Sequence, residues 1–289
     1  MRQGVGRAMT PALAPIRAAL LAAVLLGAGP VLWSAFADQS SGPSFVEVPA
    51  GPFTMGAGPA KTPEAFDNER WSAAAEEGTL DLPAFYIARH ETTIGEYAAF
   101  VAATGWTTDP RALAGPVDAP VAFVSWPDAL AYCRWLTRGL AGRPPGDPVL
   151  AGRLRAGWIA TLPTEAQWEK AARGPDGRRY PWGVEPRRDR AQFDAPGVSP
   201  VGAHPCPECA YGLDDMAGNV WEWTRSPSQP YPYDEADDRQ HLDTDALWTI
   251  RGGGFADRAR LVRGSARGAA EPGARRAFIG FRVAIVPPR

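Results

Sequence analysis

The sequence is poor in cysteine and histidine, with three of each among 289 residues. A tetrahedral zinc site takes four such ligands, and here only Cys206, Cys209 and His204 lie close together in the chain. One histidine and two thiols are too few for that kind of site. The sequence also offers no arrangement of serine, histidine and acid, or of paired carboxylates, that would indicate a hydrolase or a lyase.

A surplus of positive charge is missing as well. The formal net charge is −2 at pH 7, and no run of basic residues alternates with aromatics as a groove that follows a phosphate backbone requires. We therefore do not expect nucleic acid as a partner. Apolar residues are not scarce: 45% of the chain is hydrophobic and 21% is charged, so a folded core of ordinary size is expected.

The first 37 residues contain no acid. Arg2, Arg7 and Arg17 precede an uncharged run over residues 18–36, which ends in a small-x-small pattern at residues 35–37. This order predicts a signal peptide over residues 1–37, with a membrane anchor as the alternative because the run is nearly long enough to span a bilayer. In both cases we expect a periplasmic or secreted protein, which contacts a membrane only if the segment is not cleaved.

Export would decide whether the cysteines can form disulfides. An oxidising compartment allows Cys206 and Cys209, which are separated by two residues, to close a small disulfide loop. Cys133 lies in an apolar helical pattern at residues 129–136, so we expect a buried small side chain and not a reactive thiol.

Glycine, proline and tryptophan are abundant, at 31, 30 and 11 residues. They indicate a loop-rich fold whose irregular segments are fixed by large aromatic side chains. A strand, a tight turn and a second strand are predicted over residues 45–56, and a short strand at residues 80–87. The last strand, at residues 279–285, is expected to pair with the opening hairpin and bring the two ends of the domain together.

Three capped helices are predicted. They cover residues 92–103, residues 127–140 and the segment from the N-cap Thr164 to Arg173. Residues 141–157, rich in glycine and proline, read as an exposed insertion. No long linker or internal repeat divides the chain, so we predict one α+β domain with low regular secondary structure.

Residues 211–224, with the sequence YGLDDMAGNVWEWT, combine oxygen ligands with large aromatic residues. Calcium takes about six to eight oxygens from carboxylates and inward-turned carbonyls. Asp215 and Glu222 offer the carboxylates, while Gly218 and Val220 are spaced so that their carbonyls can face the same point. The alternative is a tryptophan-rich turn whose acids are solvated, since aspartate and glycine are also common in turns.

Seven sequence blocks occur in an order that resembles the family of formylglycine-generating enzymes, or sulfatase-modifying factors. The blocks are residues 48–56, 120–135, 162–173, 180–183, 211–223, 251–254 and 280–282. The resemblance covers the domain at residues 44–287 and implies an elaborated C-type-lectin-like fold. It also implies a structural calcium held by Asp215, Gly218, Val220 and Glu222.

The family oxidases hold Cu(I) between two cysteines that follow the Arg-Gly-Gly block. Here the corresponding residues 255–267 contain no cysteine, and carboxylate or guanidinium groups cannot replace two soft thiolates. We therefore do not expect copper, and we expect a protein that binds or helps to mature a periplasmic protein or peptide partner. The alternative is an oxidase that converts a sulfatase cysteine to formylglycine, or another oxidation chemistry on the same scaffold.

If chemistry is retained, its candidate residues are those that take the place of the lost copper site. They are Trp221, Arg251, Asp257, Arg258, Arg263 and Arg267. The competing interpretation of the arginines is that they lie on solvated faces or bind backbone carbonyls.

Overall fold

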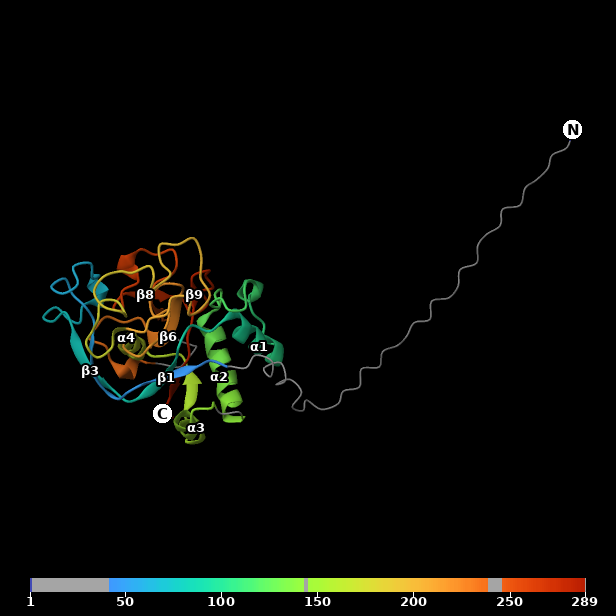
Figure 1. Cartoon of the computed structure of the whole chain (residues 1–289), viewed down its shortest axis with the longest axis horizontal. Helices are drawn as coiled ribbons and strands as arrows, with labels where there is room; N and C mark the ends of the chain where they lie inside the picture. Colours follow the sequence, from blue (N-terminus) through green and yellow to red (C-terminus); the bar gives the residue numbers. More distant parts are fainter. Residues whose placement is uncertain (2–41, 143–144, 239–245, 289) are drawn as a thin grey trace.

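The computed structural model describes residues 1, 42–142, 145–238 and 246–288 (Figure 1). Apart from Met1, the predicted signal peptide or anchor at residues 1–37 lies outside the described residues. The strands are β1 (Phe45–Val48), β2 (Gly51–Met55), β3 (Gly78–Leu82), β4 (Phe85–Ala88), β5 (Ile159–Thr161), β6 (Trp221–Pro227), β7 (Trp248–Arg251), β8 (Arg267–Ala270), β9 (Ile279–Gly280) and β10 (Ala284–Val286). The helices are α1 (Ile94–Thr104), α2 (Trp126–Gly142), α3 (Pro148–Arg155) and α4 (Glu165–Arg173), with 3-10 turns η2 (Asp67–Glu69), η3 (Pro110–Leu113), η4 (Glu235–Asp237) and η5 (Ala259–Leu261).

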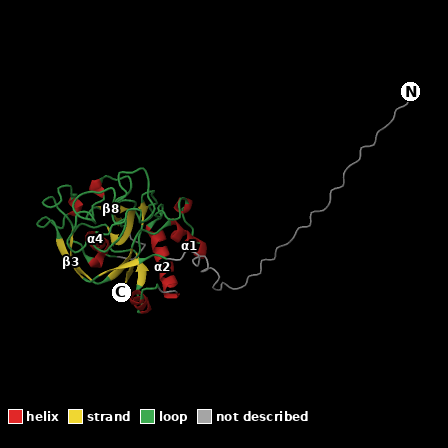
Figure 2. Cartoon of the chain, viewed as in Figure 1, coloured by secondary structure: helices red, strands yellow, loops and turns green. Residues whose placement is uncertain are grey.

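Loops make up most of the described chain (Figure 2), which confirms an α+β fold poor in regular structure. The described strands form a four-stranded sheet in the order β1-β4-β10-β5, a second in the order β8-β7-β6-β9, and the pair β2-β3. Helices α1 and α2 lie together on one side of the molecule, and α4 lies on the side of β3 (Figure 1). Strand β6 leads out of the loop at residues 211–220, so the second sheet fixes the position of that loop.

The three predicted helices are confirmed, and their ends follow from their caps. The hydroxyl of Thr93 accepts the amide of Glu96, whose carboxylate accepts the amide of Thr93 in return, and this closes the start of α1. Thr164 and Gln167 form the same reciprocal pair at the start of α4. Helix α1 ends at Gly105, whose φ of 66° is the left-handed conformation that glycine adopts without strain.

The predicted hairpin at residues 45–56 is wrong, because its two strands join different sheets. Strand β1 pairs antiparallel with β4, and β2 pairs antiparallel with β3. The carbonyls of Pro49 and Gly51 in the connecting turn accept hydrogen bonds from the ammonium of Lys170, each at 2.8 Å, instead of bonding across a hairpin.

Two further expectations need correction. Residues 279–285 form two short strands: β9 pairs in parallel with β6, whereas β10 pairs with β4 and β5 in the sheet that contains β1. The ends of the domain therefore share a sheet, with β4 between them. The segment at residues 141–157 is not simply an exposed insertion, because α3 buries Leu150 and Leu154 in the core beside α2.

Large aromatic side chains fill the core, as the composition predicted. Trp126 stacks on Trp248 with ring centroids 3.7 Å apart, and Trp168 and Trp223 are also fully buried. Each indole replaces several smaller side chains and fixes loops that lack ladder hydrogen bonds. None of the helices in the described part of the chain has the length and apolarity needed to cross a membrane.

Candidate functional site

The loop at residues 211–220 is folded tightly between the second sheet and the segment around Gln192. Asp215, Gly218 and Asn219 have φ values of 56°, 77° and 57°. A side chain at Gly218 would lie 2.2 Å from the carbonyl oxygen of Gln192, so this position requires glycine for space as well as for conformation. Trp223 follows the loop, is fully buried, and donates its indole N–H to the carbonyl of Val124 at 3.0 Å.

Three buried carboxyl groups surround this loop. Asp215 Oδ2 accepts the amide of Gly202 at 2.6 Å, while Oδ1 has no hydrogen-bond partner among the described residues. Glu91 is fully buried, and neither of its carboxyl oxygens has a hydrogen-bond partner among the described residues. Burial, and then the charge of Asp215, raises the pKa of Glu91 well above its usual range, and burial also raises the pKa of Asp215.

Glu222 has a different environment. Arg282 donates two hydrogen bonds of 2.7 Å to its carboxylate, from Nε to Oε2 and from a terminal nitrogen to Oε1. Trp168 Nε1 donates a third, also at 2.7 Å. The same guanidinium binds the backbone carbonyl of Asp215 at 3.0 Å, so Arg282 ties the strand to the loop. The charge of Glu222 is therefore already balanced within the protein.

The donor set fits a calcium ion in part. The unpartnered Oδ1 of Asp215 and the carboxyl of Glu91 are the kind of buried acidic oxygen that a cation would satisfy. Glu222 needs no cation, and no group of three or more His, Cys, Asp or Glu side chains suited to a metal was found among the described residues. If an ion binds, Asp215 would be its side-chain ligand, with Gly218 and Val220 as carbonyl ligands, and its chemistry would be structural bracing.

The region that corresponds to the family's copper site contains Trp221 and Asp257. The indole N–H of Trp221 and the amide of Gly254 both donate to Asp257 Oδ2, at 2.7 and 2.9 Å. Trp221 is 6% exposed and Phe278, which lies next to Gly254, is 41% exposed. Asp257 thus closes a turn and orients the indole; the remaining candidate in this region, Arg258, is solvent-exposed.

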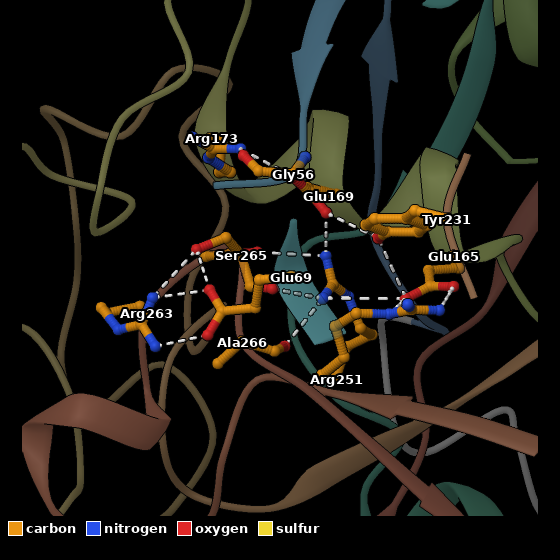
Figure 3. Close-up of polar contacts among 12 residues, drawn as sticks. Gly56, Glu69, Glu165, Glu169, Arg173, Tyr231, Arg251, Arg263, Ser265 and Ala266 are labelled. Atoms are coloured by element: carbon orange, nitrogen blue, oxygen red, sulfur yellow. Dashed lines mark hydrogen bonds and ion pairs between the residues drawn. The ribbon is translucent and has the colours of Figure 1, made fainter. Parts of the chain in front are cut away.

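Arg251 and Arg263 belong to a buried ion network (Figure 3), and Arg267 joins it through Glu165. Glu69 holds both terminal nitrogens of Arg263 at 2.6 Å. Arg251 pairs with Glu169 and donates to two backbone carbonyls of the turn that leads into β8. These three arginines therefore brace the fold through buried carboxylates as well as through the backbone carbonyls that the competing interpretation named.

Arg267 and Tyr231 connect this network to the surface. Arg267 pairs with both oxygens of Glu165 at 2.6 and 2.7 Å, and its guanidinium carbon lies 3.9 Å from the centre of the Tyr231 ring. Both residues line a cleft of about 530 Å³ between residues 67–73, residues 228–231 and strand β8. Burial, together with the charges of Glu165 and Glu169, raises the pKa of Tyr231 well above its usual value, so the phenol stays protonated in the physiological range.

The cysteines are distributed as the sequence suggested. Cys206 and Cys209 are bonded to each other, with their Cα atoms 5.3 Å apart. Cys133 is 1% exposed inside α2, and burial raises the pKa of its thiol. No free cysteine of the described chain lies in the copper region.

Sequence reasoning missed Glu91, Glu69, Glu165 and Glu169. Glu165 and Glu169 had a readable signal, because two glutamates four residues apart on a capped helix share one face. Glu91 had none, because its burial follows from the pairing of β4 with strands far away in the sequence.

Comparison with known proteins shows the family of this chain. Residues 33–286 match the family model described as a sulfatase-modifying factor enzyme 1-like domain. The chain is 34% identical over 263 residues to a hercynine oxygenase of Mycolicibacterium smegmatis, covering 83% of this chain and 60% of that protein. It is 29% identical over 257 residues to a formylglycine-generating enzyme of Mycobacterium tuberculosis, covering 64% of this chain and 75% of that one. The chain thus spans only part of the hercynine oxygenases it matches.

Solved structures share the fold. PvdO from Pseudomonas aeruginosa superimposes with a TM-score of 0.67 at 24% identity and covers 84% of this chain and 94% of its own. CarF gives a TM-score of 0.59 at 23% identity, covering 84% of this chain and 98% of its own. Because the family model spans most of the chain, this protein belongs to the sulfatase-modifying factor enzyme 1-like family, which also contains the formylglycine-generating enzymes.

Proposed function

We propose that this chain is an exported member of the family that binds a protein or peptide partner and helps to mature it, without copper-dependent formylglycine formation. The observation that carries the proposal is the environment of Asp257. A carboxylate that is committed to Trp221 and Gly254 occupies the region where the family oxidases keep two thiols. Cu(I) prefers sulfur donors, whereas the side chains in this region have only oxygen and nitrogen donors.

The cleft beside β8 is the proposed place of binding. Its walls carry amide and hydroxyl side chains, those of Asn68, Ser72, Ser228 and Gln229, which can pair with the backbone of an extended peptide. Its floor is held by the ion pair of Arg267 and Glu165, so the groups that meet the partner are fixed in advance.

Two features support the rest of the proposal. The disulfide between Cys206 and Cys209 is of a kind that persists outside the reducing cytosol, which supports export. The unpartnered oxygen of Asp215 supports a structural calcium in the loop at residues 211–224, although Glu222 would contribute less than expected from the family.

An oxidase remains the alternative, because relatives of this chain are named hercynine oxygenase and formylglycine-generating enzyme. The two proposals are separated by titrating Cu(I) into the purified protein against a colorimetric chelator, then supplying a cysteine peptide and recording oxygen consumption. We expect no tight stoichiometric copper and no peptide oxidation. The double variant Cys206→Ser/Cys209→Ser, run beside the reduced wild type, identifies any copper bound by the opened disulfide.

Partner binding is tested by placing a photo-crosslinking amino acid at Ala269, on the rim of the cleft, or at Ala102, on the exposed side of α1. Both variants are expressed with their native N-terminus and irradiated in cells. A discrete adduct from position 269 that is missing from position 102 is expected. Equal adducts from both positions, or copper-dependent oxygen consumption, would reverse the proposal.

A further inference from the structure

A second groove is lined in part by Lys170 of α4 and is separate from the cleft described above. It has a volume of about 540 Å³ and shares no lining residue with that cleft. Its apolar walls include Pro49, Pro52, Pro175 and Tyr211. Tyr211 lies at the start of the loop that holds the proposed calcium site, Pro49 lies in the turn between β1 and β2, and Pro52 is the second residue of β2.

Lys170, in the last turn of α4, lines this groove and is only 2% exposed. Its ammonium donates to the carbonyls of Pro49 and Gly51, each at 2.8 Å. An ammonium has three N–H donors, so one is left over after these two bonds. Only two of the 30 basic residues in the chain are lysines, Lys61 and Lys170, and Lys170 is the buried one.

The charge of Lys170 has no counter-ion among the described residues. The buried arginines Arg173, Arg251 and Arg263 each have a carboxylate partner, whereas Lys170 forms no ion pair in the described part of the chain. Burial lowers the pKa of Lys170, with Asp81 as a weaker opposing influence. A buried cation without a counter-ion is costly, and an anion in the groove would lower that cost.

Arg178 adds a second cation at the edge of the groove. It pairs with the exposed Asp176 at 3.0 Å and donates to the carbonyl of Glu208 at 2.6 Å. Asp176 also lines the groove, so its charged lining consists of two cations and one carboxylate, with a net positive charge, next to proline and tyrosine surfaces.

We propose that this groove binds an organic carboxylate with an apolar body, whose carboxylate pairs with Lys170 and whose apolar part packs on the prolines and Tyr211. The carboxylate is that of a small acid or of a peptide C-terminus, since the same chemistry recognises both. The groove shares no lining residue with the partner cleft and includes none of the proposed calcium ligands, so it stands or falls separately from the proposed function.

The presence of only two lysines allows a direct test. Protein labelled with 15N at lysine Nζ gives two side-chain resonances, and the purified chain is titrated with benzoate or with the neutral isostere benzamide. We expect a saturable shift of the Lys170 resonance with benzoate, no shift at Lys61, and binding of benzamide weaker by about tenfold or more. A dipeptide with a free C-terminal carboxylate and its amidated form distinguish a peptide end from a small acid.

Lys170→Gln keeps donors for the two turn carbonyls and removes the charge; Lys61→Gln is the matched control on an exposed lysine. Benzoate should no longer shift the backbone amide of Tyr211 in Lys170→Gln and should still do so in Lys61→Gln. If Lys170→Gln does not fold, the wild-type comparison of benzoate with benzamide decides alone. Equal shifts of both lysines, equal binding of the two probes, or no shift at all would overturn the proposal and leave Lys170 as a brace for the turn.

Discussion

At the scale of single residues, the buried arginines of this protein act as structural cross-links. Arg251, Arg263 and Arg282 are fully buried, and each is matched by a glutamate that comes from a different segment of the chain. Each guanidinium also donates to at least one backbone carbonyl of a loop. Such planar, multiply donating side chains suit a fold with little regular structure, because each one fixes several loop carbonyls at once.

Glu69 provides the sharpest test of this role. Its carboxylate accepts two hydrogen bonds from Arg263, one from Ser265 and one from the amide of Phe66. Glu69→Gln removes the negative charge and leaves Arg263 buried without a counter-ion, so we expect a loss of about 3–5 kcal/mol in the free energy of unfolding. Urea denaturation followed by tryptophan fluorescence measures it.

Arg111→Gln is the control for that substitution. Arg111 pairs with Asp109 on the surface, where water screens the interaction, so the midpoint of unfolding should not change measurably. Equal stability of Glu69→Gln and the wild type would mean that the network contributes nothing beyond its packing.

At the scale of elements, the loop at residues 211–224 contains a buried carboxyl group that a bound cation would satisfy. Its tryptophans are held by the core, but the carboxyl of Asp215 is buried with one oxygen unsatisfied. A ligand that binds only the folded state raises stability by mass action. We therefore expect calcium to raise the melting temperature of the wild type relative to protein treated with a chelator.

Asp215→Asn should abolish that calcium-dependent increase, since a neutral amide is a weaker ligand for a hard cation. Asp214→Asn is the matched neighbour: Asp214 Oδ1 accepts the amide of Cys206 at 3.2 Å and is not expected to bind the ion. Differential scanning fluorimetry with and without calcium compares the three proteins. An unchanged calcium response in Asp215→Asn would place the ion elsewhere.

How far the sequence determines these elements depends on the range of the interactions. Helices α1 and α4 were predictable to within two residues because Thr93 and Thr164 form capping boxes with residues three positions away. The separation of β1 from β2 was not, because β1 pairs with β4 and β2 pairs with β3, and both partners lie outside residues 45–56. The pattern that singles out the loop at residues 211–224 lies within that segment, so it could be read from the sequence. The ion network and the burial of Glu91 could not, because they depend on residues far apart in the chain.

At the scale of the whole molecule, the disulfide between Cys206 and Cys209 makes the stability of the fold depend on the redox conditions around it. The disulfide closes a loop between two residues three positions apart, next to Asp214 and the candidate calcium loop. The chain-entropy model assigns about 2 kcal/mol to a loop of this length, because the link restricts the unfolded chain. Stability should therefore depend on whether the protein has been exported to an oxidising environment or retained in the cytosol.

We expect protein recovered from its own compartment to show no reactive thiol when folded, since Cys133 is buried, and one thiol per chain when unfolded without reductant. Reduction should raise the count to three and lower the free energy of unfolding by about 2 kcal/mol. The variant Cys206→Ala/Cys209→Ala should have the lower stability from the start and should not respond to reductant. Three thiols in the unreduced, unfolded protein would contradict the disulfide in the living cell, and the argument for export would then rest on the N-terminal sequence alone.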